Sequence, residues 1–263
     1  MLLPRRRPRW PSRRVAHAAD SAVPAPRRGG PDLPYRLIAG VEPCPGGWLV
    51  VGARLQGVTA LPTDPEVFPS FADILDWRPA FDVLAVHCHL SFPSEDTPGG
   101  RSCDREARQL LGWPREGAIT SPPSRALLAS GDLRQRPRKG LSPITAQMLQ
   151  RYAEVAEEMQ PYRQRQVFEV HPELSFFQLN GDKPMEHAKE TPRGVSERRR
   201  LVEARIPGID VVLEAQLPGV QMRHLLDASA AMVTARRIAA RAVQRVPEEP
   251  EWDDEGVRME ILR

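Results

Sequence analysis

Three apolar runs follow one another near the start of the chain, and the turns between them are too short to hold a helix. The runs cover residues 35–42, 48–55 and 57–61, and their composition favours strands. Short connections of this kind join antiparallel neighbours, so the runs predict a three-strand meander. A fourth apolar run, residues 81–86, follows a segment with helical spacing at 68–77. A strand that is reached through a helix lies parallel to its predecessor.

The remainder of the chain alternates between helical patterns and single strands. A further strand is expected at residues 166–170 and a last edge strand at 257–262, with a loop at 247–254 before it. Helices are expected at residues 104–111, 142–160, 172–179, 195–204 and 221–245. We therefore predict an α/β fold in which a mixed sheet carries helices on its faces.

The predicted sheet brings two polar residues to one edge. Glu42 ends the first strand, and His87 follows the fourth. If the fourth strand returns beside the first, both residues open on the edge where α/β sheets usually bind ligands. The sequence therefore predicts a site that includes Glu42 and His87.

The net charge of +3 is unevenly distributed along the 263 residues. Residues 1–30 hold eight arginines and one aspartate, which gives +8 − 1 = +7, so the remainder of the chain carries +3 − 7 = −4. We interpret residues 1–33 as a disordered Arg/Pro-rich tail and residues 34–263 as a single domain. The tail is either a nucleic-acid-binding arm or an extension without function, and we favour the second. A mildly acidic body does not favour a surface that coats a duplex, although it is compatible with a local basic cleft.

The composition argues against several classes of protein. No apolar run approaches the roughly 20 residues of a membrane helix, and none follows the N-terminal arginines as in a secretory signal, so we expect a cytoplasmic protein. The three cysteines, Cys44, Cys88 and Cys103, lack the C-x-x-C spacing of structural zinc sites and are too few for a disulfide scaffold. The sequence contains neither a G-x-x-x-x-G-K-[ST] loop nor a G-x-G-x-x-G fingerprint, so it does not support nucleotide binding of those types.

Five ordered segments carry a resemblance to a known family. They are GVEPCPGGW at residues 40–48, GGRSCDREAR at 99–108, FEVHPELSF at 168–176, KETPRG at 189–194, and LLDA at 225–228 followed by TAR at 234–236. From about residue 37 to residue 261 the chain resembles the domain-of-unknown-function 429 family, whose members are described as predicted nucleases with an RNase H-like fold. The resemblance implies an RNase H-like mixed sheet, in which a three-strand meander precedes parallel strands.

The same resemblance implies metal-dependent hydrolysis of phosphodiester bonds, with nucleic acid as a partner. Enzymes of this fold hold two Mg²⁺ or Mn²⁺ ions about 3.5–4 Å apart with carboxylates, and the ions activate water and stabilise the leaving oxygen. The implied catalytic residues are Glu42, Glu169, His171, Glu173 and Asp227. The implied metal ligands are Glu42, His87, Glu169 and Asp227. The implied phosphate-binding residues are Arg101, Arg105, Arg108 and Lys189.

Two positions depart from the family pattern. Glu42 replaces the first-strand aspartate, and its longer side chain would move a bound metal. His87 replaces the fourth-strand aspartate, and a neutral imidazole is a poor ligand for Mg²⁺. We therefore expect a catalytically weakened hydrolase. The alternative is a non-catalytic member of the same fold that binds nucleic acid or a protein, and a third, weaker possibility is a small phosphorylated or acyl substrate.

Glu42 and His87, at the sheet edge, are also open to a purely structural interpretation. Glu42 is either a metal ligand or an acid left at a strand end. His87 and His89 face the same side of an extended chain, where with Glu42 they would suit Zn²⁺, Mn²⁺ or Fe²⁺. Otherwise one histidine packs and the other is solvated, which is the interpretation we favour.

The acid–histidine cluster near residue 170 leaves a similar choice. Glu169 and His171 share one side of a strand, and Glu173 opens the next helix. We favour metal ligation or water activation by this group. The alternative is a first-turn acid on a helix, with His171 as a satisfied buried group.

The helix-borne charges are also open to two interpretations. Asp227 lies on an apolar helix face and needs a partner, either a metal ion or an arginine. Arg105 and Arg108 either hold phosphate at a helix start or belong to a solvated face, and the same choice applies to Lys189.

Overall fold

A computed structural model of the chain describes residues 34–129 and 143–263. The predictions for the tail at residues 1–33, and for the beginning of a helix at residue 142, lie outside the described residues. Contacts within the chain group Pro34–Arg263 together as one unit. Among the helices in the described ranges, none has both the length and the hydropathy of a membrane span.

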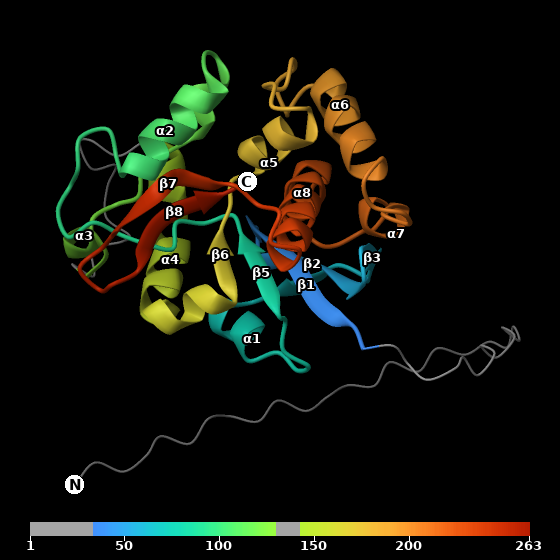
Figure 1. Cartoon of the computed structure of the whole chain (residues 1–263), viewed down its shortest axis with the longest axis horizontal. Coiled ribbons are helices and arrows are strands. Elements are labelled where there is room, and N and C mark those ends of the chain that lie inside the picture. The colour runs from blue at the N-terminus through green and yellow to red at the C-terminus, as the bar shows by residue number, and fades with distance from the viewer. Residues whose placement is uncertain (1–33, 130–142) are drawn as a thin grey trace, which may run out of the picture. The chain divides into compact units, whose positions relative to one another are not determined.

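The first half of the main sheet is the predicted meander (Figure 1). β1 (Arg36–Cys44) pairs antiparallel with β2 (Gly47–Gln56), and β2 pairs antiparallel with β3 (Thr59–Pro62). The turn between β1 and β2 includes Gly46 at φ +90°, a conformation that favours glycine. A short strand that the sequence pattern did not reveal, β4 (Glu66–Phe68), also pairs with β2.

The second half of the main sheet is parallel, which confirms the predicted mixed sheet. β5 (Val83–Val86) lies parallel to β1, and β6 (Val167–Glu169) lies parallel to β5. The strand order is therefore β3-β2-β1-β5-β6, the arrangement that the RNase H-like resemblance implied. Because Val41 pairs with Val86, the ends of β1 and β5 meet at one edge.

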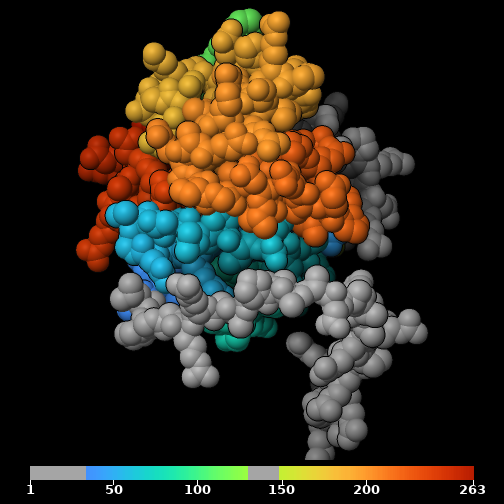
Figure 2. Space-filling model, turned by 90° about the vertical axis from the view of Figure 1, so that its right-hand side faces the viewer, coloured from blue at the N-terminus to red at the C-terminus, as the bar shows by residue number. Residues whose placement is uncertain are grey.

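Helices cover both faces of the main sheet, as predicted. One hydrophobic core includes α5 (Pro172–Leu179), α6 (Pro192–Glu203), α7 (Asp210–Leu213) and α8 (Met222–Ala239). The core on the other face includes α1 (Phe71–Leu75) and α4 (Pro143–Glu158), and a third cluster joins α2 (Ser102–Leu111) to α5. Shorter helical segments are α3 (Arg125–Ala129) and the 3₁₀ turns Arg115–Ala118 and Pro161–Arg165. Figure 2 shows the orange surface of the α6 and α7 region directly above the blue surface of the N-terminal strands.

The long helix α8 lies directly on β1, and a glycine permits this contact. A Cβ atom at Gly40 would lie only 2.0 Å from the carbonyl oxygen of Ala228 and 2.3 Å from the amide nitrogen of Met232. A side chain at this position would therefore push the helix away from the strand. The close packing also fixes Asp227, next to Ala228, relative to β1.

In the C-terminal region, the structure differs from the sequence prediction at two places. The helix expected at 221–245 ends at Ala239, and the loop expected at 247–254 is instead largely β7 (Arg245–Trp252). β7 pairs antiparallel with β8 (Arg258–Leu262), so the expected last strand is present but belongs to a separate two-stranded sheet. Pro247 and Pro250 interrupt the strand pattern of β7, and the pairing register shifts between Val246 and Glu251.

Candidate functional site

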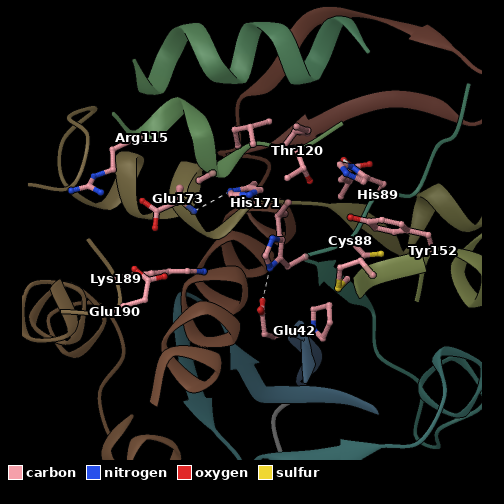
Figure 3. Close-up of a pocket in the computed structure, with 18 of the residues that line it drawn as sticks. Glu42, Cys88, His89, Arg115, Thr120, Tyr152, His171, Glu173, Lys189 and Glu190 are labelled. Atoms are coloured by element: carbon pink, nitrogen blue, oxygen red, sulfur yellow. Dashed lines mark hydrogen bonds and ion pairs between the residues drawn. The ribbon is translucent and has the colours of Figure 1, made fainter. Parts of the chain in front are cut away.

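A cleft of about 370 Å³ opens where β1, β5 and β6 end (Figure 3). Its lining comes from strand ends, the 3₁₀ turn at 115–118, α4, α5 and the loop before α6. Figure 3 shows Lys189, Glu190 and Glu173 on one side and His89, Cys88 and Tyr152 on the other. Other residues that line the cleft are Glu42, His87, Arg115, Ile119, Thr120, Met148, Glu169 and His171.

The meeting of two strand ends produces an acid–imidazole pair. Nδ1 of His87 lies 2.6 Å from Oε2 of Glu42, and since a carboxylate only accepts, the imidazole donates. The side chain of Glu42 is 7% exposed and that of His87 is 25% exposed. Among the described residues, the contact with Glu42 is the one hydrogen bond of the His87 ring, so Nε2 takes part in none. The sequence prediction that Glu42 and His87 share one edge is therefore confirmed.

The environment of His87 favours its protonated form more than water does. Burial disfavours the charged imidazole, but the charge of Glu42 and the hydrogen bond to it outweigh that cost and raise the pKa of His87 above its ordinary value. The imidazole of His87 therefore keeps its proton to a higher pH than a free imidazole does.

Asp227 and Lys189 form a second pair beside the first. Nζ of Lys189 donates to Oδ2 of Asp227 at 2.9 Å, so the partner of Asp227 is a lysine and not the arginine considered above. Asp227 is almost fully buried, and its Oδ1 has no hydrogen-bond partner among the described residues. Burial raises the pKa of Asp227 despite the nearby charge of Lys189, and Glu42 adds to the rise. We call Glu42, His87, Lys189 and Asp227 the cleft cluster.

A second ionic group lies behind the cleft, centred on Arg101. Its Nη2 donates to Oδ1 of Asp104 at 2.7 Å and to Oε1 of Glu169, and its Nη1 donates to Oγ of Ser91 at 2.8 Å. Nδ1 of His89 lies 2.9 Å from Nη2 and 3.3 Å from Oε1 of Glu169, so it accepts from the guanidinium in one tautomer and donates to the carboxylate in the other. We call Arg101, Asp104, Glu169, His89 and Ser91 the Arg101 cluster.

The Arg101 cluster is largely buried, and its members His89 and Glu169 also border the cleft. Arg101 is 2% exposed, and Asp104 is fully buried. Burial would raise the pKa of Glu169, but the charge of Arg101 and the hydrogen bonds from it hold that pKa at about 2. Arg101, expected from the resemblance to bind phosphate, instead lies in the interior and donates to internal partners.

His171 and Glu173 have structural partners of their own. Nδ1 of His171 accepts from the backbone N–H of Glu173 at 3.2 Å, which caps α5, and its ring also bonds the backbone of Ala118. Burial, together with the charges of His87 and Lys189, lowers the pKa of His171 well below its ordinary value. This arrangement supports the interpretation of His171 as a satisfied neutral group.

The carboxylate of Glu173 is held by a buried arginine. Nη2 of Arg198 donates to both oxygens of Glu173, at 2.8 and 3.0 Å, and both residues are buried. The expected acid–histidine pair of Glu169 and His171 does not form, because each partner is engaged elsewhere. The acid–histidine pair with the shortest contact is Glu42–His87, at 2.6 Å against 3.3 Å for His89–Glu169 and 3.6 Å for His187–Glu197.

The other two arginines expected to bind phosphate stabilise a loop. Arg105 donates to the carbonyl of Gly100, and Arg108 donates to the carbonyls of Gly99 and Ile119. Neither arginine lines the cleft. Of the four residues expected to bind phosphate, Lys189 is the one that does line it.

The donor set can be compared with the two-metal centre that the resemblance implied. Mg²⁺ and Mn²⁺ need several carboxylate oxygens that are free to coordinate. Both oxygens of Glu169 and of Glu173 receive arginine hydrogen bonds, one oxygen of Glu42 receives the imidazole hydrogen bond of His87, and one oxygen of Asp227 receives the ammonium hydrogen bond of Lys189. The residues therefore do not fit a two-metal centre.

Among the described residues, one group has ligand atoms close enough together to surround an ion. Atoms of His89, Asp104 and Glu169 lie within 4.8 Å of one another. The guanidinium of Arg101 contacts all three, so a side-chain cation stands where a metal ion would have to be. This group is an ion-pair network and not an open metal site.

Comparison with known proteins adds the family. A family model described as "Protein of unknown function (DUF429)" matches residues 40–252, more than half of the chain. The chain belongs to this family. No curated protein matches it. A Thermus thermophilus RuvC structure aligns over 78% of this chain and 97% of its own, with 15% sequence identity and a TM-score of 0.31. A likeness at that level does not establish the fold. The fold follows from the strand order of the main sheet.

Within this DUF429 domain, sequence reasoning missed the residues that neutralise the acids. Nothing in the sequence indicated that Arg198 pairs with an acid. The family resemblance implied that Arg101 binds phosphate, whereas Arg101 pairs with internal acids. Arg101 precedes Glu169 by 68 positions, so no local spacing reveals the pair. Tyr152 on α4 was not considered either, because it reaches the cleft only through helix packing. The pairing of Arg101 with Asp104 is the exception, because an arginine three residues before an acid at a helix start is a local signal.

Proposed function

We propose that this chain hydrolyses phosphodiester bonds in the cleft, with the Glu42–His87 pair as its acid–base group. The observation that carries the proposal is the 2.6 Å contact between Oε2 of Glu42 and Nδ1 of His87, in a cleft that Lys189 also lines. A carboxylate that holds one ring nitrogen fixes the tautomer and leaves the other nitrogen basic. Two-metal catalysis was predicted from the family resemblance, and the donor set described above does not support it.

The chemistry assigned to these residues is general base catalysis. His87 takes a proton from water at Nε2, and the water oxygen forms a bond to phosphorus. The ester P–O bond breaks, and the leaving oxygen takes a proton from the imidazolium or departs as an anion. Glu42 stabilises the imidazolium in between, and the ammonium of Lys189 supplies positive charge for the phosphate.

Two variants and one matched control test this assignment. Bis(4-nitrophenyl) phosphate releases a coloured product when one ester bond is cleaved. His87→Ala and Glu42→Gln are expected to lower kcat by about 100-fold or more, the typical contribution of a positioned acid–base group. The control is His187→Ala, because His187 also lies near an acid, Glu197 at 3.6 Å, but not in the cleft.

The outcomes of that assay are distinct. Loss of activity in the two cleft variants, with a normal rate in the His187→Ala control, supports the proposal. Wild-type rates in the cleft variants would contradict it, as would a wild-type protein that releases no product. Thermal denaturation of each variant shows whether a lost rate reflects a lost fold.

A second candidate function has one observation in its favour. Each of the four carboxylates proposed as a catalytic acid contacts a cationic or imidazole side chain of the chain itself, as expected of a fold that has lost its metal chemistry. On this account the protein binds nucleic acid or a protein without cleaving anything. Restoring the family acids in a Glu42→Asp/His87→Asp double variant would then create Mn²⁺-dependent cleavage that the wild type lacks. If the double variant stays inactive while the wild type hydrolyses the ester without metal, this candidate is excluded.

A further inference from the structure

The cleft has the dimensions of a site for a small ligand. Its volume of about 370 Å³ falls at the lower end of the range for small-molecule pockets, about 300–1,000 Å³. The turn at 115–118 and α4 close it on the side away from β1, with Ala118, Met148 and Tyr152 among the lining residues. A continuous strand of nucleic acid would need an open groove along several residues, whereas this enclosure suits one compact group.

The charges that line the cleft also limit what it can hold. Lys189 and Arg115 are the cationic residues among those that line it, and Arg115 already donates to the carbonyls of Met185 and Glu186. The lining also includes four glutamates, Glu42, Glu169, Glu173 and Glu190. A polyanion is bound through several lysine or arginine contacts to successive phosphates. Lys189 donates one N–H to Asp227, and its ammonium has two further donors, which match a single phosphate group.

The two sides of the cleft differ in polarity. Lys189, Glu190 and Glu173 form the charged side in Figure 3, and Tyr152, Cys88 and the imidazole of His89 lie on the other. Met148 and Ile119 add apolar surface to the lining. A ligand that fits both sides carries one charged phosphate and one apolar or aromatic group.

We propose that the cleft takes a compact phosphodiester of about one nucleotide in size, with a single phosphate at Lys189 and an aromatic or apolar group against Tyr152 and Met148. The inference deepens the hydrolase function proposed above and rests on it. Two sources share this chemistry, a free nucleotide-like ester and the terminal nucleotide of a strand. The interior of a continuous strand is not such a source.

Three substrates distinguish these sources. Thymidine 5′-(4-nitrophenyl phosphate) represents the free ester, a linear oligonucleotide offers strand ends, and circular single-stranded DNA offers none. We expect hydrolysis of the nitrophenyl ester and an intact circle. Shortening of the oligonucleotide from its ends would identify the strand terminus as the source, and an intact oligonucleotide would identify the free ester. Cleavage of the circle with a kcat/KM equal to that of the ester would overturn the inference and leave the hydrolase function standing.

If no substrate is cleaved, the hydrolase function is contradicted, but the inference about the ligand is not. Binding measurements then test that inference. Calorimetry with thymidine monophosphate should show binding to the wild type that Lys189→Met weakens about 10-fold or more, as expected for a charged hydrogen bond. The matched control is Lys183→Met, because Lys183 is exposed and does not line the cleft. Lys189→Arg keeps a cation beside Asp227 if Lys189→Met fails to fold. Equal affinity of wild type and Lys189→Met, or tighter binding of circular DNA than of the mononucleotide, would overturn the inference.

Discussion

The cleft cluster and the Arg101 cluster begin from the same feature, an acid at the end of a strand, and reach opposite states. In the Arg101 cluster, one guanidinium donates to Asp104, Glu169 and Ser91 and is 2% exposed. In the cleft cluster, Nε2 of His87 takes part in no hydrogen bond among the described residues, and the side chain remains one quarter exposed. The buried guanidinium ties the Arg101 cluster into an internal ion-pair network that stabilises the fold, whereas the cleft cluster has a partly exposed imidazole that can take part in chemistry.

The largest effect is expected from removing the central cation of the Arg101 cluster. Arg101→Met leaves Glu169 and Asp104 buried without their counter-charge, so the free energy of unfolding should fall by about 3–5 kcal/mol. The matched control is Arg199→Met, because Arg199 pairs with Glu203 on the surface, where such a pair contributes about 0.5 kcal/mol. Urea denaturation measures both. Equal losses in the two variants would show that the Arg101 cluster is not a buried ion pair.

The same substitution sharpens the comparison by exposing a potential metal site. With the guanidinium gone, His89, Asp104 and Glu169 retain ligand atoms within 4.8 Å of one another. We expect Zn²⁺ or Mn²⁺ to raise the melting temperature of Arg101→Met and not that of the wild type. A wild-type protein that is stabilised as strongly would show that the arginine does not occupy the place of an ion.

Acid should weaken the Arg101 cluster only well below neutral pH. The pKa of Glu169 is about 2 in the folded protein against 4.5 as its ordinary value, so its contribution is present above about pH 4.5 and is lost as the pH falls toward 2. A shift of that size corresponds to roughly 3 kcal/mol of folding free energy. Urea denaturation between pH 6 and pH 2.5 should show this loss in the wild type. In Glu169→Gln the dependence should be smaller, whereas the surface control Glu203→Gln should keep it. An unchanged slope in Glu169→Gln would contradict the assignment.

The pH dependence of hydrolysis tests the cleft cluster. General base catalysis needs neutral His87, and Glu42 raises the pKa of that imidazole, so the rate should rise with pH through a pKa above the ordinary histidine value and then level off. Glu42→Gln removes the charge that raises the pKa. The midpoint of its residual activity should therefore move to lower pH. A midpoint that stays in place would show that Glu42 does not control His87.

The smallest effect is expected at the rim of the Arg101 cluster. Ser91 is fully buried, and its Oγ accepts from Nη1 of Arg101 at 2.8 Å. Ser91→Ala should lower the free energy of unfolding by about 1–2 kcal/mol, because the guanidinium keeps its other partners. Urea denaturation measures this loss, and hydrolysis by the variant should be unchanged. A large loss of activity would show that the two clusters are not independent.

Much of the fold could be predicted from the sequence, because its strands carry their signal locally. The apolar runs that became β1, β2 and β5 were identified, and the pairing of β1 with β5 brought Glu42 to His87 as expected. β7 was missed because Pro247 and Pro250 break the pattern that marks a strand. The end of α8 was misplaced because residues 240–243 contain no glycine or proline to stop a helix.

The candidate site was less predictable, because its electrostatics depends on residues far apart in the chain. The contact of Arg198 with Glu173, and that of Lys189 with Asp227, arise from how α5, α6 and α8 pack together. No local pattern encodes such contacts. The acids themselves were identified through the family resemblance, and the resemblance does not show which cations this chain places beside them.

The most direct test of the account is the rate of bis(4-nitrophenyl) phosphate hydrolysis by the wild-type protein, measured in excess chelator and again with added Mn²⁺. The account holds that side-chain cations of the chain neutralise the acids that would hold metal, and that Glu42 and His87 act without an ion. It predicts the same rate in both conditions. Activity that disappears in chelator and returns with Mn²⁺ would contradict it.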